Sequence, residues 1–184
     1  MAEVINVTTG KPKVGGAISE APAGTTLPTD ATSALANTFV NFGYVSEDGL
    51  TNSNTAENEQ TVAWGGDVVM DTMTSKPDQF TYTLIEATNV DALKHVYGSS
   101  NVSGTLTAGI TINANSTEQA EKVIVIDMVL RGPAVKRIVI PRGKVLTVGD
   151  IVYNDTDPVG YEVTLAAYPD ASGNTHYEYI KKSS

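Results

Sequence analysis

The most informative absence in this chain of 184 residues is cysteine, of which there is none. Without thiols the chain forms no disulfides, thiolate nucleophiles or zinc–sulfur sites, and nothing points to an oxidising compartment. Long apolar runs are also missing, because the longest, Val123 to Leu130, contains Asp127 and is too short to span a bilayer. The N-terminal residues have no apolar core. We therefore expect no secretory signal and no membrane binding by the chain itself.

Motifs of catalysis and metal binding are absent as well. The sequence has no phosphate-binding loop, dinucleotide fingerprint, nucleophile elbow or zinc-protease helix. The two histidines, His95 and His176, are expected to be ordinary surface or core residues rather than a metal pair. The acidic stretch 154–157 is better explained as a turn capped by side-chain carboxylates, since Ala166 stands where a calcium loop needs a carboxylate. We predict that the protein is not an enzyme and has no catalytic residues, cofactor or metal.

Basic residues are scarce in the first part of the chain. None occurs between Lys13 and Lys76, a stretch with eight acids, and the net charge of the chain is −9. This balance argues against a conventional nucleic-acid binder. A later stretch from Arg131 to Lys144 reverses the sign, with five cations and no acid. The two stretches are either solvated faces or complementary patches through which copies of the chain associate.

The alternation of apolar and polar residues predicts a series of short strands. In the stretch 121–131 we expect Ile124 and Ile126 to point inward and Asp127 to lie on the opposite face. The expected strands are 39–45, 60–64 continuing beyond Gly65–Gly66 to 70, 79–87, 104–114, 121–131 and 134–140, followed by a closing hairpin of 160–168 and 175–181. This pattern is typical of a mainly β fold, either two packed antiparallel sheets or an open barrel.

One segment is expected to be a helix. Asn89 is a suitable N-cap, and Val90, Leu93 and Val96 recur at helical spacing. Gly98 stands where a glycine would end the helix, after about two turns. The remaining organisation is a polar N-terminal arm at 1–13, a single domain at 14–184 and, within it, a long polar loop at 46–58.

The helix and the strand before it also carry a family resemblance. The pattern E-x-T-N-x-x-x-L-x-x-V-Y-G from Glu86 to Gly98 resembles the major tail protein, or tail tube protein, of long-tailed, non-contractile (siphovirus-type) bacteriophages. The resemblance covers about residues 14–181 and is carried further by the stretches FGYVSEDGL, VAWGGDVV, VKRIVIPRGKV and GYEVTLAAYPDASGNTHYEY.

The resemblance implies a structural subunit of the virion tail. Its copies would form rings, expected to be hexameric, that share a β-barrel and stack into a tube whose lumen conducts DNA during ejection. The implied partners are other copies of the chain, tape measure protein and phage DNA in the lumen, and tail terminator and distal tail proteins at the tube ends. Assembly would take place in the host cytoplasm.

The resemblance also assigns candidate contact residues. A projecting loop contacts the next ring in that family, which implies a ring-stacking loop of Ser46, Glu47, Asp48, Gly49, Leu50, Thr51 and Glu57. The lone tryptophan, Trp64, is expected to be a core or interface anchor. With it, the candidates for the interface between subunits are Gly65, Gly66, Asp67, Arg131, Lys136, Arg137, Arg142 and Lys144.

Two alternatives remain open at this point. The first is the inner-tube subunit of a contractile tail or of a tail-derived injection system, which shares the expected fold. The second is a β-sandwich carbohydrate-binding or adhesin domain. That domain would be a monomer with an exposed aromatic patch, for which Tyr168, Tyr177 and Tyr179 are the candidates.

Overall fold

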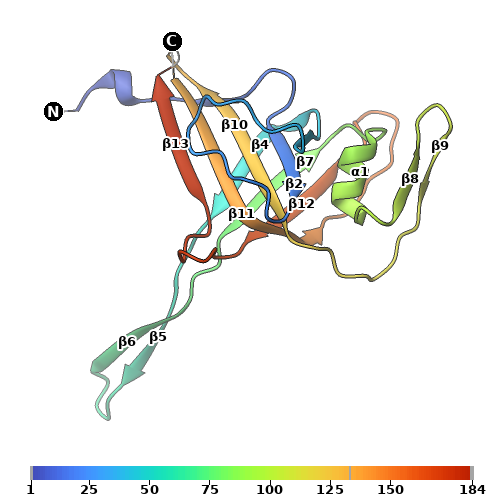
Figure 1. Cartoon of the computed structure of the whole chain (residues 1–184). Coiled ribbons are helices and arrows are strands. Elements are labelled where there is room, and N and C mark those ends of the chain that lie inside the picture. The colour runs from blue at the N-terminus through green and yellow to red at the C-terminus, as the bar shows by residue number, and fades with distance from the viewer. Residues whose placement is uncertain (1, 133, 183–184) are drawn as a thin grey trace.

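The protein is mainly β, as expected from the sequence, and its described residues contain one α-helix (Figure 1). The computed structural model describes residues 2–132 and 134–182. The elements run in the order η1 (Val4–Asn6), β1 (Gly10–Pro12), β2 (Ile18–Pro22), β3 (Val40–Asn41), β4 (Val45–Ser53), β5 (Glu57–Val62), β6 (Val68–Ser75), β7 (Gln79–Leu84), α1 (Val90–Tyr97), β8 (Val102–Thr105), β9 (Gly109–Ile112), β10 (Lys122–Leu130), β11 (Ala134–Val148), β12 (Tyr161–Ala167) and β13 (Tyr177–Lys182).

A single antiparallel sheet forms the body of the molecule. Its strand order is β3-β2-β10-β11-β12-β7-β4, and β1 adds to β10 while β13 adds to β11. The polar N-terminal segment expected at residues 1–13 is therefore held in part by the sheet, because Gly10–Pro12 pairs with the end of β10. The expected closing hairpin is wrong: β12 and β13 both form, but each pairs with β11 and not with the other.

Strand β11 explains this arrangement. Its first part, from Ala134 to Val139, pairs with β13, and its last part, from Gly143 to Val148, pairs with β12. Between the two parts, Pro141 and Arg142 together oppose a single residue of β10, which is a β-bulge. A bulge bends and twists a strand and tolerates proline. The strand therefore continues through the segment Pro141–Gly143, where the sequence predicted a break after Ile140.

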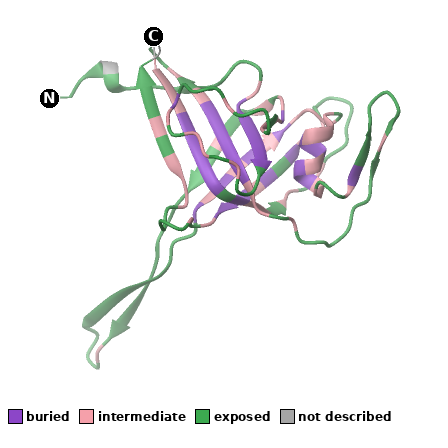
Figure 2. Ribbon diagram, in the orientation of Figure 1, coloured by how far each residue is buried: buried purple, intermediate pink, exposed green. Residues whose placement is uncertain are grey.

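The core lies between the curled sheet and the helix (Figure 2). Ile124 and Ile126 of β10 are buried in it, as predicted, together with Leu93 of the helix. The helix begins after Asn89, whose Oδ1 accepts hydrogen bonds from the backbone N–H groups of Asp91 (3.0 Å) and Ala92 (3.4 Å). It ends before Gly98, whose φ of 94° suits glycine. The predicted helix and both of its cap residues are confirmed.

A buried polar network ties the helix to the sheet. His95 approaches Glu20 of β2 through Nδ1 (2.8 Å) and Tyr82 of β7 through Nε2 (2.7 Å), and Lys122 of β10 also contacts Glu20. Burial favours a raised pKa for Glu20, but the hydrogen bonds and charges of His95 and Lys122 outweigh it and hold this pKa below its usual value. The network connects the helix to β2 and β7, which are far apart in the strand order of the sheet. The helix therefore holds the two sides of the curled sheet together.

A small hairpin of β8 and β9 projects beside the helix (Figure 1). The sequence predicted one strand across 104–114, and this is wrong. Gly104 pairs with Ile110 across the hairpin, and a Cβ on Gly104 would lie 2.0 Å from the carbonyl oxygen of Gly109. Apart from His95, the chain carries no acidic or basic side chain between Lys94 and Glu118 that would be charged near neutral pH. The hairpin is thus polar but uncharged.

Candidate functional site

The most conspicuous surface feature is a second, longer hairpin. Strands β5 and β6 pair only with each other and project from the body of the molecule beyond the end of β4 (Figure 1). We call the segment Glu57–Ser75 the arm. Both of its strands are exposed at every position (Figure 2). Because neither strand has a buried face, its sequence shows no regular apolar alternation.

The predicted loop at 46–58 is therefore wrong as a structure. Residues 46–53 belong to β4, an edge strand of the main sheet that pairs with β7, and residues 57–58 begin the arm. Only residues 54–56 lie outside a strand. The stacking role expected for Ser46, Glu47, Asp48, Gly49, Leu50, Thr51 and Glu57 stays a prediction, now attached to an edge strand and the base of the arm.

The tip of the arm presents the only tryptophan. Trp64 and Gly65 form a turn in which Ala63 N donates to Asp67 O (2.8 Å) and Gly66 N donates to Ala63 O (3.0 Å). Both glycines have positive φ, as such a turn requires. Trp64 is fully exposed, at 107% of its reference accessibility. It is thus not a core anchor of its own chain, and its role as an interface anchor stays a prediction.

The arm combines exposed apolar side chains with negative charge. It carries four acids and no lysine or arginine. Its large exposed apolar residues are Val62, Trp64, Val68, Val69, Met70 and Met73. An isolated two-stranded hairpin is marginally stable in water at best, and a concentration of exposed apolar residues marks an interaction surface. The arm has the properties of a binding element.

The root of the arm is anchored by one buried carboxylate. Asp78 precedes β7. Its Oδ1 accepts a hydrogen bond from Asn52 Nδ2 (2.8 Å). Its Oδ2 accepts one from Thr175 Oγ1 (2.5 Å) and also contacts His176 Nδ1 (2.5 Å). Its backbone oxygen accepts from Ala167 N (2.8 Å). Asp78 therefore joins β4 and β7, which lead into and out of the arm, to the segments around β12 and β13. The sequence gives no signal for this cluster.

Arg137 is not where the sequence placed it. It was expected at the interface between subunits, but it is only 1% exposed and forms a bidentate ion pair with Asp127, with Nε–Oδ1 at 2.6 Å and Nη2–Oδ2 at 3.0 Å. Its Nη1 donates to the backbone oxygen of Ser33 (2.8 Å) and so holds a covering loop. The positions of the two residues in the sequence indicate the pair. Asp127 and Arg137 lie equally far before and after Gly132 in the connecting turn, and they are therefore register partners on the two strands.

Most other cations of the expected basic stretch are also paired within the chain. Lys136 lies 2.7 Å from Glu178, Arg142 lies 2.7 Å from Glu121, and Lys144 contacts Glu118. The hydrogen bond from Arg142 lowers the pKa of Glu121. The stretch 131–144 is thus not a bare positive patch. An interface role for Arg131, Lys136, Arg142 and Lys144, and for Gly65, Gly66 and Asp67 at the arm tip, stays a prediction.

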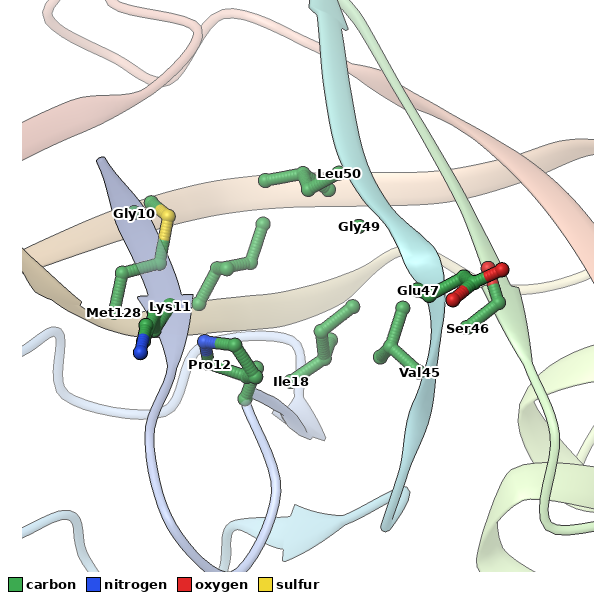
Figure 3. A pocket seen from close by; sticks show the side chains of 12 residues that line it. Gly10, Lys11, Pro12, Ile18, Val45, Ser46, Glu47, Gly49, Leu50 and Met128 are labelled. Carbon is green, nitrogen blue, oxygen red and sulfur yellow. The ribbon is translucent and has the colours of Figure 1, made fainter.

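An apolar pocket lies at the open side of the curled sheet. Its volume is about 230 Å³, and it lies between β1, β4 and β10 (Figure 3). Lys11 stands at its outer rim, and Glu47 lies across β4 with its side chain directed away from β1. The apolar lining residues are Pro12, Ala17, Ile18, Val45, Leu50, Ile126 and Met128. The pocket suits an apolar side chain better than a polar metabolite.

The three tyrosines of the adhesin alternative do not form an exposed patch. Tyr168, Tyr177 and Tyr179 are all partly buried. The rings of Tyr177 and Tyr179 stack at 6.5 Å with an interplanar angle of 7°, and the Tyr177 hydroxyl donates to Asp170 Oδ2 (2.6 Å). These contacts stabilise the fold and partly cover the rings.

Two further features concern metal binding and membrane-spanning helices. Within residues 2–132 and 134–182, no group of three or more histidine, aspartate or glutamate side chains is placed to hold a metal ion. No helix in that part of the chain is long and apolar enough to cross a membrane. The turn expected at 154–157 forms, but its cap is the amide oxygen of Asn154 and not a carboxylate: this oxygen accepts from Thr156 N (3.0 Å) and Asp157 N (2.7 Å).

Comparisons with known proteins complete these observations. A family model described as phage tail tube protein matches residues 13–184. A solved structure described as the anti-feeding prophage cap, the tube-terminating cap, aligns with 100% of this chain and 100% of that chain, with a TM-score of 0.43 and 10% sequence identity. No match was found among curated proteins.

Proposed function

This chain belongs to the phage tail tube protein family, and on that premise we propose that its copies form stacked rings joined by the arm and by the edges of the main sheet. Membership makes the protein a structural component of the phage tail, present in the virion, that assembles with itself into a tube and meets the proteins at the tube ends. The proposal adds how this chain makes the contacts.

The arm is the observation that carries the proposal. Its strands are exposed throughout, and its apolar side chains have no partner surface in their own body. Leaving so many apolar groups in water is unfavourable, at about 25 cal/mol for each Å² of apolar surface that a partner would bury. In the proposed tube, a second copy of the chain supplies that partner. The arm thus serves as a contact between neighbouring subunits.

Open strand edges support the same conclusion. Strands β3, β4, β1 and β13 each pair on one side only among the described residues. Exposed edges favour pairing with further strands, and a ring in which sheets join edge to edge covers them. A head-to-tail contact of this kind closes on itself when the rotation between copies fits a ring. We propose six copies for each ring.

The charge of the chain fits a tube that conducts DNA. The net charge is −9, so a lumen lined by these subunits binds phosphate weakly and lets the duplex slide. In this proposal the lumen also holds the tape measure protein before ejection, and tail terminator and distal tail proteins close the two ends of the tube. The tail is non-contractile. Assembly takes place in the host cytoplasm.

Negative-stain electron microscopy of the purified chain at rising concentration tests the proposal. We expect rings or hollow tubes of one uniform width. The matched control replaces residues 57–75 by an Asn-Gly turn that joins residue 56 to residue 76, and it should remain a folded monomer or stop at single rings. A wild-type chain that stays monomeric at every concentration would refute the proposed assembly.

A further inference from the structure

Building on the proposed function, we propose that Trp64 of one copy inserts into the apolar pocket between β1, β4 and β10 of a second copy. This assigns the arm a specific receptor and the pocket a specific occupant. Each is a surface of the same chain, and the two match in size, polarity and charge.

The arm presents Trp64 as an ordered, exposed anchor. The turn at the tip is closed by the hydrogen bonds between Ala63 and Asp67 and between Gly66 and Ala63. Val62 and Val68, each about half exposed, flank the indole. The buried carboxylate of Asp78 fixes the root of the arm. Because the turn already holds the backbone at Trp64, binding costs less conformational freedom there than it would in an open loop.

The pocket offers an apolar site of suitable size. Its floor contains Ile18 and Ile126, which are fully buried, and its walls contain Val45, Leu50 and Met128, which are only partly covered (Figure 3). A volume of about 230 Å³ accommodates an aromatic side chain. Large aromatic residues in such pockets are the usual centres of binding energy at protein interfaces.

The occupant comes from another copy because the arm leads away from the pocket. Val45 and Leu50 line the pocket from one part of β4, whereas Ser53 at its other end leads toward the arm. The arm continues outward from that end and does not fold back over the sheet (Figure 1). Arm and pocket therefore lie on different parts of the subunit. Their union is a heterologous contact, which propagates from copy to copy.

Charge complementarity favours this pairing. Asp67 lies beside Trp64 at the tip of an arm that has no cation, while Lys11 lines the rim of the pocket. Lys13 follows on the same segment and contacts Asp127 at 3.3 Å. Glu47 also lines the pocket, but its side chain points away from β1, so it does not face Lys11 (Figure 3). Rim charges of this kind steer association and fix orientation.

The tryptophan provides its own probe, since the chain contains only one. We expect its fluorescence emission to shift to shorter wavelength when monomers assemble, because the indole leaves water. Trp64→Ala should weaken association by at least about thirtyfold, as expected for a central aromatic anchor. The matched control is Tyr153→Ala, a change at an aromatic residue that is 72% exposed and lies outside the arm, and it should leave association unchanged.

A charge swap tests the pairing itself. Lys11→Glu and Asp67→Lys should each weaken association about two- to fivefold, and the double variant should recover most of the loss. Recovery requires that the two residues meet in the assembly. Sedimentation and light scattering give the association constants, and both residues lie at exposed positions, so the fold of the monomer is preserved.

Each other outcome overturns the inference in a distinguishable way. Tubes in which Trp64 keeps the emission of an exposed indole would leave the proposed function intact and remove the inference. A shifted emission with no recovery in the charge-swapped double variant would place Trp64 on a different surface. A wild-type chain that never assembles would refute the proposed function, and the inference with it.

Discussion

Two antiparallel hairpins of this molecule, β10–β11 and the arm of β5–β6, share a backbone plan and differ in almost everything else. In β10 every residue from Val123 to Asp127 is buried, whereas neither strand of the arm has a buried residue. The first hairpin is stabilised by the core of its own chain. The arm lacks such support, so its apolar side chains remain available to another molecule. Burial thus separates residues that determine folding from residues that determine assembly.

The two hairpins also use charge differently. Asp127 and Arg137 are register partners on neighbouring strands and neutralise each other inside the body. The arm has acids without any cation, so its charge is directed outward. The comparison predicts that substitutions in the body change the free energy of unfolding of the monomer, and that those in the arm change association. The predictions below run from the largest expected change in unfolding free energy to the smallest.

The largest change is expected when the buried ion pair is broken. Arg137→Met leaves the Asp127 carboxylate buried without its main partner, and this should lower the free energy of unfolding by about 3–5 kcal/mol. Urea denaturation of the monomer measures the loss. Arg142→Met is the matched control, because Arg142 also pairs with a carboxylate, Glu121, but at the surface, and it should cost less than about 1 kcal/mol. Equal losses in the two variants would contradict the assignment of Arg137 to the body.

The next change concerns the network around the helix and depends on pH. Glu20→Gln removes the charge that His95 and Lys122 face, and should cost about 1.5–3 kcal/mol at neutral pH. The pKa of Glu20 is lowered in the folded state, so its carboxylate stabilises the fold fully above its ordinary value of 4.5. This contribution is lost as the pH falls through the lowered pKa.

The measurement is the difference in unfolding free energy between wild type and the Glu20→Gln variant as a function of pH. It should be largest near neutral pH and shrink below pH 4.5. A difference that stays constant down to acid pH would show that the variant acts through packing and not through the charge. The arm should contribute nothing to this pH dependence of the unfolding free energy, since it lies outside the network of Glu20, His95 and Tyr82.

A smaller change is expected at the root of the arm, where body and arm meet. Asp78→Asn keeps the shape of the side chain but weakens its hydrogen bonds to Thr175 and His176, at a cost of about 1 kcal/mol. The fluorescence anisotropy of Trp64 should fall in the monomer, because the arm is no longer held in one direction. Unchanged anisotropy would mean that Asp78 stabilises the body and does not orient the arm.

Local signals explain what the sequence predicted well. The helix was found because Asn89, Gly98 and the apolar spacing between them all act within a few residues. Strand β10 was found because it is the most apolar run of the chain, as burial of successive residues from Val123 onward requires. The two glycines at which the predicted strand 60–70 is interrupted, Gly65 and Gly66, lie in the turn between β5 and β6, where positive φ selects glycine at both positions. In each case the cause and the signal lie in the same short segment.

The errors arose where distant residues decide the structure. The proline at position 141 looked like the end of a strand, but β10, β12 and β13 all pair with β11 and carry it through a bulge. The exposed strands β4 and β5 looked like a loop, because without a buried face they need no apolar alternation. The candidate site was predicted in part: the tip residues 64–67 were named, but neither the arm around them nor Asp78 at its root was.

The smallest change in stability is expected within the arm itself. Met70→Ser combined with Met73→Ser removes apolar groups that are exposed in the monomer, so the free energy of unfolding should stay within about 0.5 kcal/mol of the wild-type value. Association should nevertheless be lost, because these side chains supply apolar surface to the neighbouring copy. Sedimentation velocity compares the variant with Leu106→Ser, which alters an apolar side chain of similar exposure (67%) between β8 and β9. If both variants block assembly equally, apolar exposure alone does not distinguish the arm, and the contrast between the arm and the rest of the surface fails.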